Sequence, residues 1–276
     1  MKQKFSNYLI FSFLSIVLLF SNSCKKTDTP DTSTASAIDC VNAENYFCDI
    51  KNIADEAGLK NGSFNGILND SLITVSYDTI NHSDLDTITI SFGTNNITCQ
   101  DGRLRKGKII TTYNGKYSDT AKTHVIKLYN FYVDNSNVTG TIKDSYKGYN
   151  LSGHQNFADT VNGSIIYNTG KTLNWNSTSK LAYTAGDSSS VWSNRIMIIN
   201  GNSYGIASDG DGFSSLISTP LLKNFSSEGC RKYLTKGVIQ IAISSKSYRA
   251  ADLGDGTCDN SITVGIDGNN YQVNTN

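Results

Sequence analysis

The chain has 276 residues with 24 basic and 24 acidic side chains, so its formal net charge is zero. A balanced charge excludes a general electrostatic attraction to nucleic acid or anionic membrane surfaces, and we expect no nucleic-acid partner. The acidic residues are 21 aspartates and three glutamates, and 23 glycines accompany only two prolines. Aspartate and glycine favour turns, so this composition is typical of an antiparallel β-protein with tight turns.

The first 23 residues have the pattern of a secretory signal. Lys2 and Lys4 precede an apolar run of 13 residues, Tyr8 to Phe20, which is followed by Ser21-Asn22-Ser23-Cys24. As a helix this run is about 20 Å long, which is shorter than the roughly 30 Å core of a bilayer. It therefore predicts a signal peptide at residues 1–23 rather than a membrane span.

Cys24 is the expected lipid attachment site. It lies at the right distance from the apolar run, and a polar leader follows it. Typical lipoprotein signals carry leucine three residues before the cysteine, where this chain has Ser21, so ordinary cleavage after Ser23 without lipidation is the alternative. Residues 24–40 are expected to form a flexible tether, because the segment is rich in threonine, serine and aspartate.

Residues beyond the tether predict one helix followed by many strands. The helix is expected from Ala43 to Ala57, with its apolar residues on one face and Gly58 just past its end. From Leu72 onward apolar residues alternate with polar ones, as in half-buried strands. The predicted strands are Leu72–Tyr77, Thr87–Phe92, Lys108–Tyr113, Thr123–Val133, Val138–Lys143, Gly163–Tyr167, Val191–Ile199, Ser203–Ala207, Val238–Ser244, Ser261–Ile266 and Tyr271–Val273.

Asn-Gly and Asp-Gly pairs between these strands, such as Asn200-Gly201 and Asp267-Gly268, indicate tight hairpins. Successive hairpins predict an all-β fold over residues 41–276, a large antiparallel meander with one short N-terminal helix. Ten or more strands must curl, split or close, so a curved open barrel and a sandwich both remain open. A similar order of residues around Cys99 and Cys258 leaves open a domain of two related halves.

Five cysteines follow Cys24, and an odd number cannot all pair. Cys230 and Cys258 flank the predicted strand Val238–Ser244, so we expect them to form a disulfide. Cys48 on the helix and Cys99 are a second candidate pair, which leaves Cys40 in the leader. Because none of the spacings is Cys-x-x-Cys, a zinc or redox motif is not expected.

The titratable residues suggest no catalytic centre. His82, His124 and His154 lack metal-ligand spacing, and no nucleophile elbow or phosphate loop is present. The three glutamates lie outside the predicted strands, which weakens a paired-glutamate glycosidase, although the many aspartates leave a carboxylate pair open. We therefore expect a protein that is not an enzyme and has no catalytic, cofactor-binding or metal-binding residues.

The strongest basic segment is Asp101 to Lys108, which contains Arg103 and Arg105. These two arginines are the candidate contacts for a glycan or another anion. The alternative is that the segment lies at a sheet edge, where charged side chains prevent aggregation.

Several motifs carry a resemblance to a known group of proteins. They are Ser23-Cys24-Lys25-Lys26, Cys99-x-Asp101-Gly102-Arg103-x-Arg105-x-Gly107-Lys108-Ile109, Pro220-Leu221, Cys230-Arg231 and Gly254-Asp255-Gly256-Thr257-Cys258-Asp259-Asn260. The first is similar to the start of Bacteroidota outer-membrane lipoproteins. Over roughly residues 85–273 the chain resembles uncharacterised lipoproteins of that phylum. The resemblance implies a location and a single fold, and it implies no activity.

The sequence thus predicts a lipid-anchored, non-enzymatic lipoprotein of the outer membrane, structural or ligand-binding. Its expected partners are the membrane, through Cys24, and a glycan or a small apolar ligand. Two alternatives remain open. One is a periplasmic carrier that holds an apolar ligand in a half-open barrel, and the other is a glycan-acting hydrolase with two converging carboxylates.

Overall fold

A computed structural model describes residues 30–59, 64–79, 85–189, 191–226, 228–244 and 246–276. The predicted signal peptide, Cys24 and the part of the predicted tether before residue 30 lie outside these residues. Residues 32–276 form one compact unit, to which the following description refers. Within the described residues, no helix combines the length and the apolar character that a membrane crossing needs.

The long helix α2 (Ala35–Gly58) occupies the interior of this unit. It begins eight residues before the predicted Ala43, so residues 35–40 are helical and not part of a tether. Ala37, Cys40 and Val41 are buried, and their packing extends the helix toward the N-terminus. In all, 21 of the 24 residues of α2 are buried, including charged ones. The expected division into an apolar and a solvent-facing side is therefore wrong.

A single antiparallel sheet surrounds α2, and the predicted all-β meander is confirmed. The strands follow one another in chain order from β1 to β14, except that β3 pairs only with β4. Their bounds are β1 (Thr74–Asp78), β2 (Asp86–Ser91), β3 (Ile97–Thr98), β4 (Leu104–Tyr113), β5 (Thr123–Val133), β6 (Ser136–Tyr149), β7 (Gln155–Ile166), β8 (Thr172–Ala185), β9 (Ile196–Ile206), β10 (Gly212–Asn224), β11 (Lys236–Ile243), β12 (Arg249–Asp255), β13 (Ser261–Ile266) and β14 (Asn269–Asn274).

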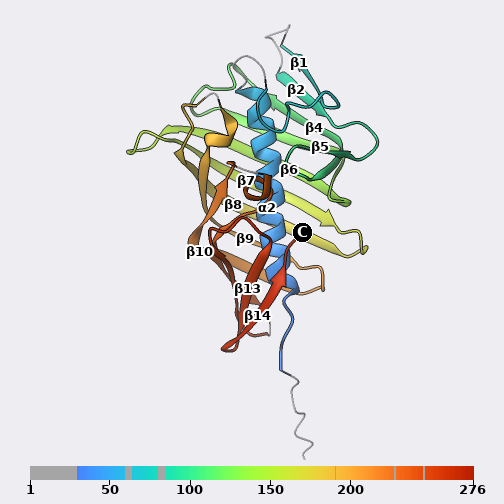
Figure 1. The fold of residues 1–276 in the computed structure, drawn as a ribbon, viewed down its shortest axis with the longest axis vertical. Coiled ribbons are helices and arrows are strands. Elements are labelled where there is room, and N and C mark those ends of the chain that lie inside the picture. Colours follow the sequence, from blue (N-terminus) through green and yellow to red (C-terminus); the bar gives the residue numbers. More distant parts are fainter. Residues whose placement is uncertain (1–29, 60–63, 80–84, 190, 227, 245) are drawn as a thin grey trace, which may run out of the picture. The chain divides into compact units, whose positions relative to one another are not determined.

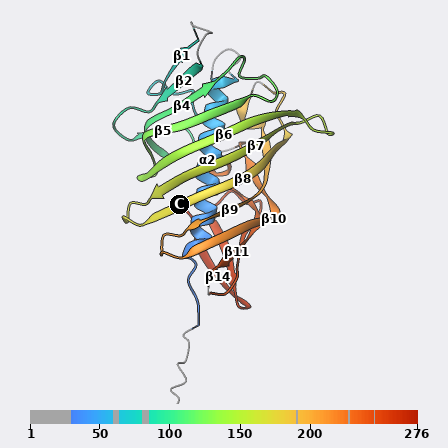
Figure 2. The ribbon, with the colours of Figure 1, turned by 180° about the vertical axis from the view of Figure 1, so that it is seen from behind.

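The sheet is open, with β1 and β14 as its two edges, and it is not split into a sandwich. Figure 1 shows α2 in front of the middle strands with β13 and β14 folded toward it, and Figure 2, seen from the opposite side, shows β4 to β10 crossing in front of the helix. Because the sheet curls around α2, its strands have an inner face, and the helix packs against this face. Two short elements complete the fold, a 3₁₀ turn (Trp192–Asn194) and helix α3 (Glu228–Lys232).

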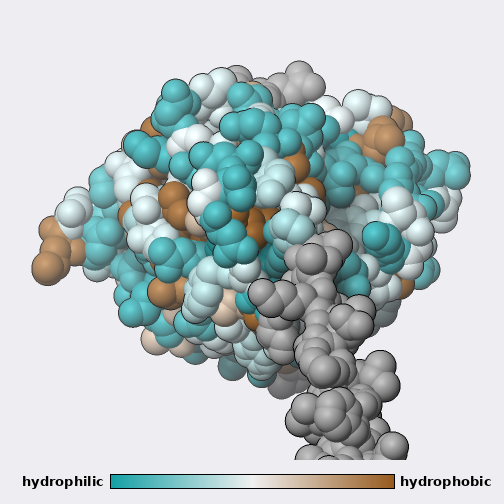
Figure 3. Space-filling model, turned by 90° about the horizontal axis from the view of Figure 1, so that it is seen from below, coloured by the Kyte–Doolittle hydropathy of each residue, from teal (hydrophilic) through white to brown (hydrophobic). Residues whose placement is uncertain are grey.

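The core is one continuous apolar cluster between α2 and the inner face of the sheet. Tyr46 and Ile50 of the helix and Ile109, Trp175 and Ile241 of the strands are almost completely buried. Large exposed hydrophobic side chains are scattered among several strands and loops. The face in Figure 3 is correspondingly mostly hydrophilic with isolated hydrophobic residues.

Two predictions about the strands are wrong for identifiable reasons. Asn200-Gly201 is not a turn but lies inside β9, where a Cβ on Gly201 would collide with the Thr178 carbonyl of β8. Glycine is needed there for a close approach of two backbones rather than for a hairpin.

Strands β8 and β10 are absent from the predicted strands. Serine, asparagine and threonine fill much of β8, and β10 contains Pro220. The pairing of β10 shifts register around this proline.

Among the cysteines, Cys230 of α3 and Cys258 of the β12–β13 loop form a disulfide. Cys40, Cys48 and Cys99 are buried free thiols, so the second candidate pair, Cys48 with Cys99, is not formed. The two thiols have different surroundings. Asn52 donates a hydrogen bond of 3.2 Å to the Cys48 sulfur, whereas Cys99 belongs to the turn before β4 and lies near Arg105.

Candidate functional site

Three adjacent strands place a row of titratable side chains inside the sheet. His124 of β5 is directly opposite Asp144 of β6, and Asp144 is directly opposite Asp159 of β7. Because side chains alternate between the two faces of a strand, residues in direct register share a face. All three are buried, which places them on the inner face beside α2.

The helix adds two charged residues to this row. Lys51 and Asp55 are one turn apart, and the Lys51 Nζ donates to an Asp55 carboxylate oxygen at 2.6 Å. The Tyr117 hydroxyl donates to the other oxygen of Asp55 at 3.0 Å. We call Lys51, Asp55, His124, Asp144 and Asp159 the interior cluster.

Hydrogen bonds and ring contacts hold His124 in the interior cluster. Its Nδ1 lies 3.1 Å from an Asp144 carboxylate oxygen. The Tyr117 ring stacks on the imidazole with 3.8 Å between ring centroids and 17° between planes. Lys51 Nζ lies 3.5 Å from the centroid of the Phe157 ring. The Tyr117 and Phe157 rings are therefore in contact with the His124 and Lys51 side chains of the interior cluster.

The environment gives the two paired aspartates opposite pKa shifts. Burial, together with the neighbouring charge of Asp144, raises the pKa of Asp159 well above its usual range. Burial also acts on Asp144, but Lys51 and the His124 hydrogen bond outweigh it and lower the pKa of Asp144 to about 2. Of the two hydrogen-bonded carboxyls, Asp144 is therefore the one that ionises first, and Asp159 is the one that retains a proton to higher pH.

Lys51 supplies the positive charge of the interior cluster. Burial opposes its charged form, but Asp55 and Asp144 outweigh this effect and raise the pKa of Lys51. A carboxylate in this interior is stable only with a nearby cation. Lys51 thus balances the charge of the aspartates.

Asp55, His124 and Asp144 could also hold a metal ion. Each offers a ligand atom, and these atoms lie within 4.8 Å of one another. Within the described part of the chain, His124 Nε2 and one Asp144 oxygen have no hydrogen-bond partner. A divalent ion would compete with the Lys51 ammonium for the same carboxylates, because Lys51 Nζ already lies 2.6 Å from an Asp55 oxygen.

A small pocket lies against the His124 side of the interior cluster. Its volume is about 190 Å³, and the Tyr146 and Phe157 rings in its wall are 5.3 Å apart between centroids. Tyr149 is 67% exposed and marks the opening toward solvent. We call it the aromatic pocket. Its lining residues are Leu59, Tyr117, Ser118, Thr120, His124, Tyr146, Tyr149, Gln155 and Phe157.

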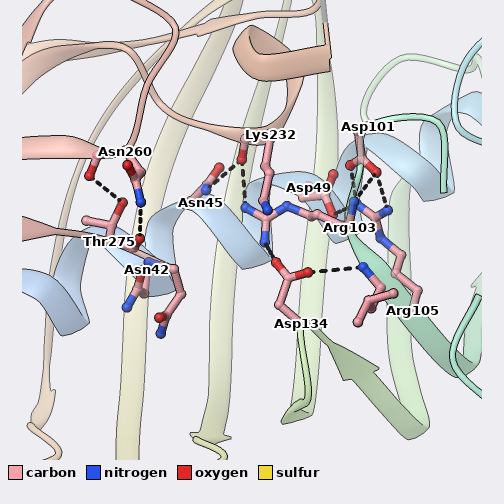
Figure 4. A network of polar contacts seen from close by, with 12 residues as sticks. Asn42, Asn45, Asp49, Asp101, Arg103, Arg105, Asp134, Lys232, Asn260 and Thr275 are labelled. Atoms are coloured by element: carbon pink, nitrogen blue, oxygen red, sulfur yellow. Dashed lines mark hydrogen bonds and ion pairs between the residues drawn. The ribbon is translucent and has the colours of Figure 1, made fainter. Parts of the chain in front are cut away.

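Arg103 and Arg105 are not in this site and do not face solvent. Figure 4 shows Arg105 directed at Asp49 of α2 and at Asp101. Arg105 donates to Asp49 at 2.7 Å and to the two Asp101 oxygens at 2.6 and 2.7 Å. Arg103 donates to Asp134 at 2.7 Å and to the Lys232 carbonyl at 2.6 Å. Both guanidinium groups are fully buried, so the expected glycan or anion contact at these arginines is corrected to a role within the fold.

The buried ion pairs of Arg103 and Arg105 connect α2, the start of β4 and α3. Although burial opposes it, the Arg105 guanidinium holds the pKa of Asp101 well below its usual range. Both arginines point inward because they alternate with outward-facing residues along β4.

Most of the interior cluster was not anticipated from the sequence. The sequence gives no role to Lys51 or Asp55, and Asp144 and Asp159 lie outside the predicted strands Val138–Lys143 and Gly163–Tyr167. Aspartate is rare in strands, so the first predicted strand ends before Asp144 and the second begins after Asp159, whereas β6 and β7 include these residues. The signal that the sequence offers is the alternation of apolar and polar residues around His124. This alternation predicts the strand Thr123–Val133, which is β5 in the structure.

Three comparisons with known proteins place the chain in no characterised group. No protein-family model, no curated protein and no solved structure matches it. Its function is therefore inferred from the geometry of its own residues.

Proposed function

We propose that the chain is a lipid-anchored, non-enzymatic binding protein of the outer membrane, attached through Cys24, and that its aromatic pocket binds a small organic cation. The observation that supports this proposal is the lining of the pocket. Four aromatic rings surround a space of about 190 Å³, and the ring of His124 connects it to the ionised Asp144.

Aromatic rings attract cations because their faces carry partial negative charge. Tyr117, Tyr146, Tyr149 and Phe157 supply such rings, and none of the described residues that line the pocket is a lysine or an arginine. Lys51 lies behind Phe157, and its charge is taken up by Asp55 and Asp144. An alkylammonium group therefore fits the pocket better than an anion or a purely apolar ligand.

The two alternative functions need features that the interior does not favour. A carrier of an apolar ligand requires an unfilled space inside the sheet, whereas α2 fills the inner face. A glycan-acting hydrolase requires two carboxylates that reach a sugar in a cleft. Asp144 and Asp159 are buried and bonded to each other, which favours a binding protein.

Calorimetric titration with choline tests the proposed ligand class. We expect saturable binding of choline and no binding of 3,3-dimethyl-1-butanol, which has the same shape without the charge. Equal binding of both compounds would show that the pocket selects shape and not charge, and absence of choline binding would reject the organic cation.

Replacing Tyr149 with leucine is expected to weaken choline binding about 3- to 30-fold, since a cation–π contact contributes roughly 0.5–2 kcal/mol. Tyr149 is 67% exposed, so the fold should be retained. Tyr204→Leu is the matched control, because Tyr204 is 61% exposed on β9 and does not line the pocket. An equal loss in both variants contradicts the assignment.

Replacing Cys24 with serine is expected to move the protein from the membrane fraction to the soluble fraction, because the thiol that carries the lipid is removed. Membrane fractionation and the intact mass of the mature chain measure the change. Ser21→Leu is the control, and it should leave the protein in the membrane. Retention of the Cys24→Ser variant in the membrane would exclude a lipid anchor at this residue.

A further inference from the structure

A second concave surface lies on the outer face of β4 and β5, away from the aromatic pocket. It is an open groove with a volume of about 540 Å³. We call it the outer groove. Its lining residues are Ser91, Gly93, Thr94, Lys106, Gly107, Lys108, Ile110, Tyr129, Asn130 and Tyr132.

An irregularity in both strands creates the outer groove. The pairing of β4 with β5 shifts register between Lys106 and Lys108. Gly107 has a φ of +90° and Asn130 a φ of +44°, both in the left-handed region. A Cβ on Gly107 would collide with the Asn130 carbonyl, so only glycine permits this close approach. Such a bulge bends the strands and redirects their side chains.

The outer groove combines positive charge with aromatic rings. The Lys106 Nζ lies 4.3 Å from the centroid of the Tyr132 ring, and Lys108 is directly opposite Tyr129. Tyr129 is 53% exposed. Hydroxyl and amide groups of Ser91, Thr94 and Asn130 complete the lining, and no residue of it that the structure describes carries a carboxylate.

Alternation along β4 separates this surface from the buried arginines. Arg103 and Arg105 point inward to their aspartates, and Lys106 and Lys108 lie on either side of Gly107 facing the groove. Asp49 and Asp101 form ion pairs with Arg105 inside the fold. The charge of the lysines remains available at the surface.

The geometry points to the outer groove as a binding site for an acidic polysaccharide. The face of a uronic acid ring would stack on the exposed Tyr129 ring, and its carboxylate would pair with Lys106 or Lys108. The groove is open at the surface, which suits a polymer segment rather than an enclosed small molecule. This inference is independent of the function proposed for the aromatic pocket.

Titration of the full mature chain with polygalacturonate tests the inference, with dextran as the neutral polymer. We expect binding of polygalacturonate at low salt, weaker binding at about 0.3 M salt, and no binding of dextran. Equal binding of the two polymers would overturn the role of charge. Binding of oligo(dT) in place of polygalacturonate would overturn the ligand class, because lysine and tyrosine grooves also bind single strands.

Two variants locate the binding to the outer groove. Lys106→Gln/Lys108→Gln should weaken polygalacturonate binding roughly tenfold, from the loss of two exposed charge contacts. Tyr129→Leu should weaken it without changing its salt dependence. Lys171→Gln/Lys180→Gln removes the same charge from other exposed positions and should have no effect. An equal loss in this control would overturn the site, and circular dichroism verifies the fold of each variant.

Discussion

Replacing Lys51 with methionine is expected to lower the free energy of unfolding by about 3–5 kcal/mol, the usual result of breaking a buried ion pair. Lys51 and Asp55 are completely buried, and Asp144 depends on the same ammonium. Methionine has a similar length but leaves these carboxylates without a cation. Urea unfolding of the variant and of the unchanged chain measures the loss.

Two further substitutions sharpen this result. Lys180→Met is the matched control, because Lys180 is exposed on β8, and it should change the stability by less than about 0.5 kcal/mol. Asp159→Asn should also cost little, since the amide can donate to Asp144 as the protonated carboxyl does. Asp144→Asn removes the ionised partner and should cost more. If the two asparagine variants were equally destabilised, the proton would not reside on Asp159.

The second large expected effect is a loss of stability as the pH rises from 4.5 to 7. Burial raises the pKa values of Glu44 and Glu56 in α2 to about 7, from ordinary values of 4.5. Within this window the folded chain keeps protons that the unfolded chain releases, so raising the pH favours unfolding. Each glutamate contributes roughly 3 kcal/mol to this change. Urea unfolding at pH 5 and pH 8 measures it.

Burial also raises the pKa values of Asp39, Asp55 and Asp159, so these aspartates add to the loss of stability in the same direction. The lowered pKa of Asp144, about 2, has the opposite effect: it stabilises the folded chain above pH 3.8, and this contribution is lost as the pH falls toward 2. Burial lowers the pKa of Lys223 to about 8, so its contribution changes with pH only above that value. Stability should therefore have a maximum near pH 4 to 5.

Glu56→Gln separates ionisation from hydrogen bonding. The Glu56 Oε1 accepts bonds from the Gly66 and Leu68 backbone N–H groups at 2.8 and 3.2 Å, and glutamine keeps this acceptor. The variant should lose roughly 3 kcal/mol of the pH dependence, and Glu44→Gln/Glu56→Gln should lose about twice as much. A stability that is the same at pH 5 and pH 8 in the unchanged chain would contradict the prediction.

The sequence predicts the hairpins well where local turn chemistry decides the structure. Asp267 and Gly268, with φ values of 48° and 78°, form the turn between β13 and β14 as expected from an Asp-Gly pair. At Gly201 the same reasoning fails, because the glycine is needed by the neighbouring strand and not by the local chain. Contacts between strands are not visible in a local pattern.

The candidate site depends on such distant contacts. His124, Asp144 and Asp159 meet only because three strands pair in one register, and they meet Lys51 only because the sheet encloses the helix. A helix with charged residues on one side predicts a solvated face in most proteins. Here the chain that follows the helix surrounds it, so the same charges become the most buried polar groups.

Enclosure of α2 also determines when the protein can complete its folding. The backbone N–H of Asn276, the last residue, donates a 2.9 Å hydrogen bond to Asn42 in the helix. This contact spans 234 positions of the chain. Proteins dominated by contacts between distant residues fold slowly. Because α2 precedes all the strands of the sheet along the chain, the helix is synthesised before them but reaches its final environment only after β14 has been made.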